Sequence, residues 1–201
     1  MTTAGDRSVR PILGGIQVQY DGPDTPLEAT LGLVVAPHGL FVTAGHAVGG
    51  PGTLVGQPAP VIGTVESNHL DEGVDIALVK IAVGVPSTPN MIWTGANSTQ
   101  AVTFESATRP KKGGVLWLQG AVSGRVQCTV HIADADVTEP TTKQKVSHVA
   151  LLILTKQTQN GDSGAPVVGE DNKCYGVYGG RVVVDGETYG WFSPFDSITW
   201  G

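Results

Sequence analysis

The sequence predicts an all-β protein made of two β-barrels or sandwiches of about 100 residues each. Short runs rich in Val, Ile, Leu and Thr recur along the chain, and Gly, Pro, Asn and Asp separate them as turn signals. No long stretch shows the 3.6-residue periodicity of an amphipathic helix. A polar segment at residues 94–114 divides the runs into two groups of about six strands, which indicates two units.

The first group of predicted strands lies before the polar segment. Each run is either continuously apolar or alternates apolar and polar residues, and each ends at a turn signal. The predicted strands cover residues 15–20, 29–37, 39–45, 53–57, 61–67 and 74–83.

The second group follows the polar segment and has the same character. Its predicted strands cover residues 115–120, 124–137, 148–155, 164–170, 173–180, 181–186 and 188–193. Only the tail, residues 193–200, has the signals of a short C-terminal helix, with Ser193 as its cap and Pro194 at its first position.

The composition excludes several classes of protein. The net charge of −6, with one short basic run at residues 109–112, argues against a nucleic-acid partner. No apolar run approaches the roughly 20 residues that cross a bilayer, so we expect no membrane segment. The first residues lack the apolar core of a signal peptide, which favours a cytoplasmic location unless a leader has been removed.

The two cysteines, Cys128 and Cys174, are too few for a disulfide-rich scaffold or a four-ligand zinc site. Both fall in predicted strands of the second group, where they could form one disulfide or remain two buried thiols. No histidine pair has metal-ligand spacing, so we expect neither a metal nor a cofactor.

A serine lies between glycines in "NGDSGAPVV", residues 160–168. Gly161 and Gly164 let the chain turn sharply, and such a turn can direct the amide N–H groups of Gly161 and Ser163 to one spot. The same residues also suit an ordinary β-turn between two strands, so this stretch alone leaves both interpretations open.

Two further stretches carry the partners that a nucleophilic serine needs. In "GLFVTAGHAVGG" an apolar strand runs into small residues and then His46, which would place the imidazole at a barrel rim. Asp75 begins an apolar strand, where its buried carboxylate would need a partner such as an imidazole N–H. Each residue alone could be structural, but together with Ser163 they supply the nucleophile, base and orienting acid of acyl transfer.

The stretches "VTAGHAV", "DIALVKI" and "NGDSGAPVV" resemble the three catalytic blocks of the chymotrypsin/trypsin-like serine proteases. The resemblance implies two six-stranded antiparallel Greek-key β-barrels with the active site in the cleft between them. Residues 12–105 would form the first barrel and residues 113–201 the second. The separation of 29 residues between His46 and Asp75 resembles the compact bacterial and viral members.

The resemblance also implies a role for each residue. His46 would be the general base and then the general acid, Asp75 would orient it, and Ser163 would attack the carbonyl carbon. The amides of Gly161 and Ser163 would form the oxyanion hole. The expected function is that of a serine endopeptidase acting on a protein or peptide substrate, alone or as a domain of a larger protein. The alternatives are a protease-fold scaffold that no longer cleaves and a self-cleaving domain.

By the same resemblance, the substrate pocket would be lined by Gln157, Asn160, Tyr178, Gly179 and Gly180. The pocket of the family starts about six residues before the serine, here at Gln157, whose uncharged side chain gives no support for a preference for Lys or Arg. Tyr178 would partly fill the pocket. Beside it, Arg181 could favour acidic substrates or simply face solvent.

Ile12 resembles the mature N-terminus of the family, where a freed amine pairs with the acid before the serine, here Asp162. Pro11 precedes Ile12, and a bond to the proline nitrogen is a poor target for a trypsin-like activator. We therefore favour the hypothesis that an internal donor binds Asp162 and that no cleavage is needed.

Overall fold

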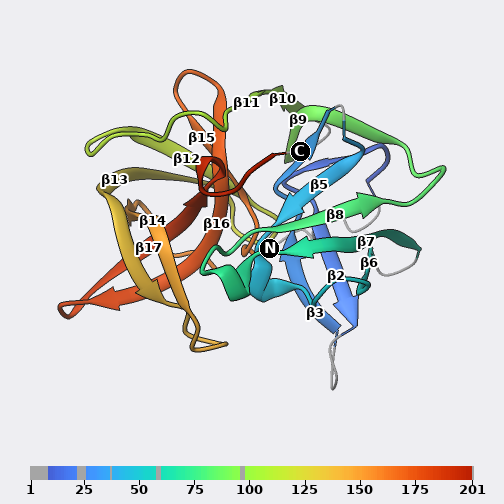
Figure 1. Cartoon of the computed structure of the whole chain (residues 1–201). Helices are drawn as coiled ribbons and strands as arrows, with labels where there is room; N and C mark the ends of the chain where they lie inside the picture. Colours follow the sequence, from blue (N-terminus) through green and yellow to red (C-terminus); the bar gives the residue numbers. More distant parts are fainter. Residues whose placement is uncertain (1–8, 22–25, 37, 58–59, 96–97, 201) are drawn as a thin grey trace.

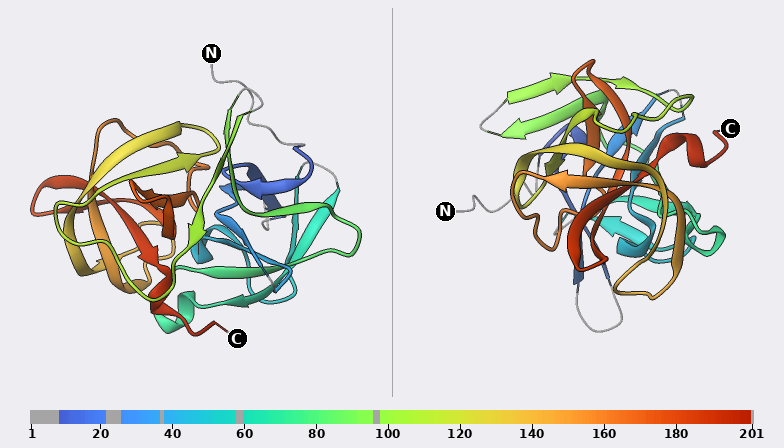
Figure 2. Two further views of the ribbon diagram at one scale, coloured as in Figure 1. Left: turned by 90° about the horizontal axis from the view of Figure 1, so that it is seen from above. Right: turned by 90° about the vertical axis from the view of Figure 1, so that its left-hand side faces the viewer.

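The computed structural model describes residues 9–21, 26–36, 38–57, 60–95 and 98–200. The described chain forms two barrels side by side, the first in blue to green and the second in yellow to red in Figure 1. The view from above in Figure 2 shows the same two bodies. The predicted all-β class with two barrels is confirmed.

The first barrel is a sheet of seven strands in the order β3-β2-β6-β7-β8-β5-β4. β3 and β4 are the two halves of one bent segment, and they pair with β2 and β5 at the two edges, so the sheet closes. The buried side chains inside include Phe41, Ile62 and Val79. The strands are β2 (Gln17–Asp21), β3 (Pro26–Thr30), β4 (Leu33–Val35), β5 (Leu40–Thr43), β6 (Leu54–Gly56), β7 (Val61–Asn68) and β8 (Ala77–Ile81).

The second barrel closes through the pairing of β16 with β17. β13 alternates buried and exposed residues along much of its length, as expected of a strand with one face on the core and one in solvent. The two predicted runs at 173–180 and 181–186 are one strand, because a register irregularity between Tyr178 and Gly180 bends it without ending it. The strands are β12 (Val115–Gly120), β13 (Gly124–Thr138), β14 (Lys145–Leu154), β15 (Pro166–Gly169), β16 (Lys173–Val184) and β17 (Glu187–Pro194).

The polar segment at residues 94–114, expected to be a break, contains two short strands and the end of a third that begins before it. β9 (Ser87–Gly95) pairs with β1 (Ile12–Gly14) and β10 (Ser98–Ala101) in a small third sheet. β11 (Thr103–Phe104) runs parallel to β16 of the second barrel. Pairing with neighbouring strands, which local composition does not reveal, accounts for these elements. The barrel boundaries 12–105 and 113–201 stay predictions.

The predicted short C-terminal helix is present as a helical turn, but its capping residue differs from the predicted one. The structure has a single 3-10 turn, η3 (Phe195–Ser197), whose capping position is Pro194 and makes no side-chain cap hydrogen bond. Ser193 lies buried in β17 opposite Val177, because strand pairing with β16 uses this residue.

A layer of buried apolar side chains joins the two barrels. Leu33, Val42 and Ile76 from the first barrel belong to the same cluster as Trp117 and Val177 from the second. This packing brings the loops of both barrels to one place. Cys128 and Cys174 are both buried free thiols in the second barrel. No helix among the described residues is long and apolar enough to cross a membrane.

Candidate active site

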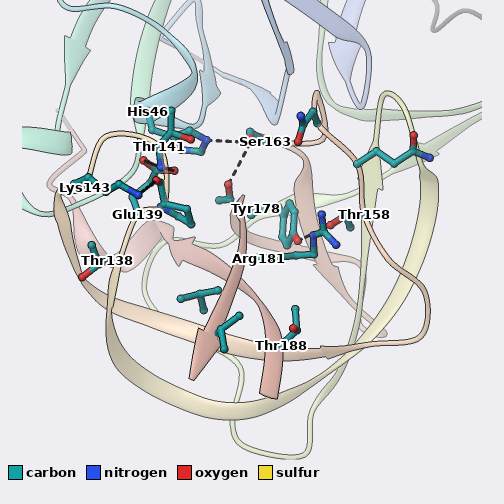
Figure 3. Close-up of a pocket in the computed structure, with 17 residues that line it drawn as sticks. His46, Thr138, Glu139, Thr141, Lys143, Thr158, Ser163, Tyr178, Arg181 and Thr188 are labelled. Carbon is teal, nitrogen blue, oxygen red and sulfur yellow. Dashed lines mark hydrogen bonds between the residues drawn. The ribbon is translucent and has the colours of Figure 1, made fainter. Parts of the chain in front are cut away.

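The structure brings His46, Asp75 and Ser163 together where the two barrels meet. His46 Nε2 lies 3.0 Å from Ser163 Oγ, and His46 Nδ1 lies 2.7 Å from Asp75 Oδ2. Figure 3 shows the contact between His46 and Ser163. The first two residues come from loops of the first barrel, and Ser163 comes from the loop between β14 and β15.

Asp75 determines the position of His46 through both of its carboxylate oxygens. Its Oδ1 accepts the backbone N–H of His46 at 2.7 Å, while its Oδ2 contacts the ring. The carboxylate is fully buried, and these contacts satisfy it. His46 lies in a 3-10 turn, η1 (Gly45–Ala47), so one acid orients both the turn and the imidazole.

Asn68, which the sequence did not single out, supports the same turn. Its Nδ2 donates to the carbonyl oxygens of Gly45 at 2.9 Å and Gly49 at 3.2 Å, and its Oδ1 accepts the N–H of Leu70 at 3.1 Å. A Cβ atom at Gly45 would lie 2.6 Å from Asn68 Oδ1. The small residue before His46 is therefore required by this close approach.

Two glycines shape the turn around Ser163. Gly161 and Gly164 have φ angles of 96° and 90°, in the left-handed region that glycine adopts without strain. A Cβ atom at Gly164 would collide with the carbonyl oxygen of Thr30 and the hydroxyl of Thr43. The loop that carries Ser163 can therefore lie directly against the first barrel only with glycine at this position.

Thr30 connects this turn to the first barrel through its side chain and its backbone. Its hydroxyl donates to the carbonyl oxygen of Gly161 at 2.7 Å, and its backbone N–H donates to the carbonyl oxygen of Ser163 at 2.7 Å. The N–H of Asp162 donates to the carbonyl oxygen of Gln159 at 3.1 Å, so the peptide between Gly161 and Asp162 is anchored at both ends.

Anchoring that peptide orients the two neighbouring amides. Among the hydrogen bonds of the described residues, none uses the backbone N–H of Gly161 or of Ser163. These are the two donors that the sequence predicted for the oxyanion hole, and both are available to a ligand.

The carboxylate of Asp162 is fully buried and is bound by backbone amides. Its Oδ1 accepts the N–H groups of Val122 at 3.1 Å and Ser123 at 3.0 Å, and its Oδ2 accepts that of Gln159 at 2.8 Å. Ile12 lies in β1, and its backbone N–H donates to the carbonyl oxygen of Pro86 at 2.8 Å. This arrangement supports the hypothesis of an internal donor.

The surroundings of His46 raise the pKa of its imidazole. Burial of the ring opposes its charged form, but the charge and hydrogen bond of Asp75 and the charge of Glu139 outweigh it, so the pKa of His46 is raised above 6.5. Glu139 lies in the loop between β13 and β14, and sequence patterns gave no signal for it. Its carboxylate accepts backbone N–H groups of Thr141 and Thr142 and the hydroxyl of Thr142.

A cavity of about 650 Å³ adjoins His46 and Ser163 (Figure 3). Four of the predicted pocket residues line it, namely Asn160, Tyr178, Gly179 and Gly180. Gln157 is exposed and is not among the lining residues, whereas Thr158 is.

Thr158, the residue after Gln157, lines the cavity. Thr158 is buried because its hydroxyl lies 2.8 Å from the hydroxyl of Tyr178. Tyr178 is 1% exposed and lines the cavity beside Ser163. Thr158, and not Gln157, lines the cavity, in a loop whose register the sequence does not define.

Among the described residues, no group of three or more histidine, cysteine or acidic side chains could bind a metal ion.

Comparisons with known proteins identify the family and the fold. The family model of the trypsin-like peptidase domain matches residues 30–177. Protease A of Thermobifida fusca superposes with a TM-score of 0.75 at 24% identity, with 92% of each chain covered. The chymotrypsin of Cellulomonas bogoriensis has a TM-score of 0.74 at 22% identity, with 92% of each chain covered. The protease of Nocardiopsis has a TM-score of 0.73 at 20% identity, covering 92% of this chain and 93% of its own. No curated protein sequence matches the chain.

Proposed function

The chain belongs to the trypsin-like peptidase family and is a serine endopeptidase by class, and from this premise we propose that it cleaves peptide bonds through Ser163, His46 and Asp75. The observation that carries the proposal is the continuous set of contacts from Asp75 through the imidazole to the serine hydroxyl. A hydroxyl alone is a poor nucleophile at neutral pH, and a base within hydrogen-bond reach activates it.

In the acylation step, His46 Nε2 takes the proton of Ser163 as Oγ bonds to the scissile carbonyl carbon. The carbonyl oxygen becomes an oxyanion, and the free amides of Gly161 and Ser163 stabilise it by about 3–4 kcal/mol per donor. Asp75 stabilises the imidazolium. His46 then gives its proton to the leaving nitrogen, the C–N bond breaks, and the acyl group stays on Ser163.

In the deacylation step, a water molecule takes the place of the leaving amine. His46 accepts a proton from the water as its oxygen bonds to the acyl carbon, and a second oxyanion forms at the same two amides. Collapse of this intermediate breaks the bond to Ser163 Oγ, which regains its proton from His46. Both barrels contribute to each step.

The alternative of a scaffold that no longer cleaves is less well supported. Such a protein would not need a base 3.0 Å from the serine hydroxyl, nor two unpaired amides beside it. The alternative of a self-cleaving domain shares the same site, and mass spectrometry of the purified chain over time distinguishes it.

Ser163→Ala tests the proposal. We expect labelling by a fluorophosphonate probe to disappear and peptide hydrolysis to fall by about 10⁶-fold, with no further loss when His46→Ala is added. Full hydrolysis by the Ser163→Ala enzyme would refute the assignment.

Ser67→Ala is a matched control within the chain. Ser67 Oγ lies 3.3 Å from His69 Nε2, and His69 Nδ1 lies 3.0 Å from Glu72 Oε2, so the connectivity imitates that of the proposed site. The side chain of Glu72 is 71% exposed, which makes it a weak orienting group. We expect this variant to keep full labelling and hydrolysis.

A further inference from the structure

The cavity beside Ser163 carries an excess of positive charge. Arg181 and Lys143 line it, and Glu139 is the acid that lines it among the described residues. The carboxylate of Glu139 is buried and accepts hydrogen bonds from its own turn at Thr141 and Thr142. In the ranges that the structure describes, Glu139 forms no ion pair with Arg181 or Lys143, so a ligand in the cavity would meet both cationic groups.

Arg181 differs from the other arginines that the structure describes. Arg10 bonds to Gln57, Arg109 pairs with Asp196 at 2.7 Å, and Arg125 lies 4.1 Å from the ring centre of Trp117. Arg181 has no hydrogen bond, ion pair or ring contact within the described part of the chain, and it is exposed. Its guanidinium keeps all five N–H donors for a ligand.

The position of Arg181 on β16 places it next to the proposed nucleophile. Ser163 Oγ contacts the carbonyl oxygen of Gly179 at 3.2 Å, two residues before Arg181 on the same strand. Figure 3 shows Arg181 beside Tyr178 and Thr158 at the cavity. A side chain that enters the cavity from a bound peptide would thus pass close to this guanidinium.

Part of the cavity lining also carries hydroxyl groups. The hydroxyl groups of Thr158 and Tyr178 lie 2.8 Å apart, and Thr188 adds a third hydroxyl to the lining. Because Tyr178 occupies part of the space, a large apolar side chain would meet these hydroxyls without matching them. A carboxylate can accept hydrogen bonds from a hydroxyl and from a guanidinium together.

We propose that Arg181 is a specificity-determining residue, and that the enzyme cleaves after Asp or Glu because Arg181 binds the side-chain carboxylate in this cavity. The inference rests on the proposed function, since it names the substrate class of the same site. A planar guanidinium can bind a carboxylate through two parallel N–H bonds, which an ammonium group cannot do.

Peptides that differ only in the residue before the scissile bond test the proposal. The set contains Glu, Asp, Gln, Leu and Lys at that position, and kcat/KM is measured for each. We expect the wild-type enzyme to prefer Glu over Gln by about 10- to 100-fold, as charge-assisted hydrogen bonds allow.

Three variants identify the residue responsible. Arg181→Gln should remove the preference for Glu, which is measured as the ratio of kcat/KM for the Glu peptide to kcat/KM for the Gln peptide in the same variant. Arg181→Lys should restore only part of the preference, and Arg125→Gln, which changes an arginine outside the cavity, should leave it intact. Equal cleavage of the Glu and Gln peptides by the wild type would overturn the proposal, as would a preference lost in Lys143→Gln but kept in Arg181→Gln.

Fluorophosphonate labelling separates this proposal from the one on which it rests. Labelling of Ser163 without preferential cleavage of the acidic peptides refutes the role of Arg181 and leaves the catalytic assignment standing. Absence of labelling in the folded wild type refutes both.

Discussion

Replacement of Thr30 by valine tests how the first barrel controls the chemistry in the second. Thr30 is fully buried, and its hydroxyl donates to the carbonyl oxygen of Gly161 at 2.7 Å and accepts the N–H of Ala121 at 3.0 Å. Valine has nearly the same shape but cannot make either hydrogen bond. The variant thus removes the anchor of the peptide that lies between the two proposed oxyanion donors.

The magnitude follows from the groups left without a partner. The carbonyl of Gly161 is buried, and leaving it unpaired costs about 1–3 kcal/mol of folding free energy. Ala121 is partly exposed, so water can replace its lost partner. For a chain of this size the melting temperature should fall by about 2–4 °C per kcal/mol. Complete loss of one oxyanion donor costs about 10²–10³ in kcat, so a displaced donor should lower kcat by about 10- to 100-fold.

The assay separates stability from catalysis. kcat and KM are measured well below the melting temperature of every variant, and stability is measured by thermal and denaturant unfolding. We expect KM to change by less than about 3-fold, because the lost interaction acts in the transition state. Thr30→Ser, which keeps the hydroxyl, should recover most of the kcat. A Thr30→Val enzyme that loses stability but keeps the wild-type kcat would show that Thr30 supports the fold alone.

Three further predictions concern other parts of the structure. The raised pKa of His46 places the acid limb of the pH profile of kcat/KM above pH 6.5, since the base must be neutral. Glu139→Gln should move that limb to lower pH, because it removes an anion that favours the imidazolium. An unchanged acid limb in this variant would contradict the prediction. Active enzyme should retain the residues before Ile12. The intact mass of the fluorophosphonate-labelled chain measures this, and a labelled population that starts only at Ile12 would contradict the prediction. Burial raises the pKa of Cys128 and Cys174 to about 12, so neither thiol should react with a disulfide reagent at pH 8 until the protein unfolds, and rapid reaction of the folded protein would contradict their burial.

The sequence could predict the parts of the site that local chemistry marks. A histidine after small residues, an acid at the start of an apolar strand and a serine between glycines are each recognisable within a few positions. The supports of the site are different, because their partners are distant in the chain. Thr30 meets Gly161 across 131 residues and Asn68 meets Gly45 across 23, so neither neighbourhood marks the residue as special.

The same distinction explains the errors in the fold. The strands with strong apolar patterns were predicted within a few residues, as for residues 115–120, which match β12. β9 was missed because its sequence shows no regular alternation of apolar and polar residues, and its pairing with β1 and β10 cannot be read from it. Ser193 was taken for a helix cap because the pairing of β17 with β16 cannot be read from the residues around it.

The way in which Asp162 is bound has a consequence for alkaline conditions. An α-amino group that pairs with a carboxylate loses its proton, and with it the ion pair, as the pH rises past its pKa, which is about 8 in model peptides. The amides of Val122, Ser123 and Gln159 have no proton to lose in that range. A site built on them keeps its turn geometry in mildly basic solution, so its activity should reach a plateau where an amine-dependent site would decline.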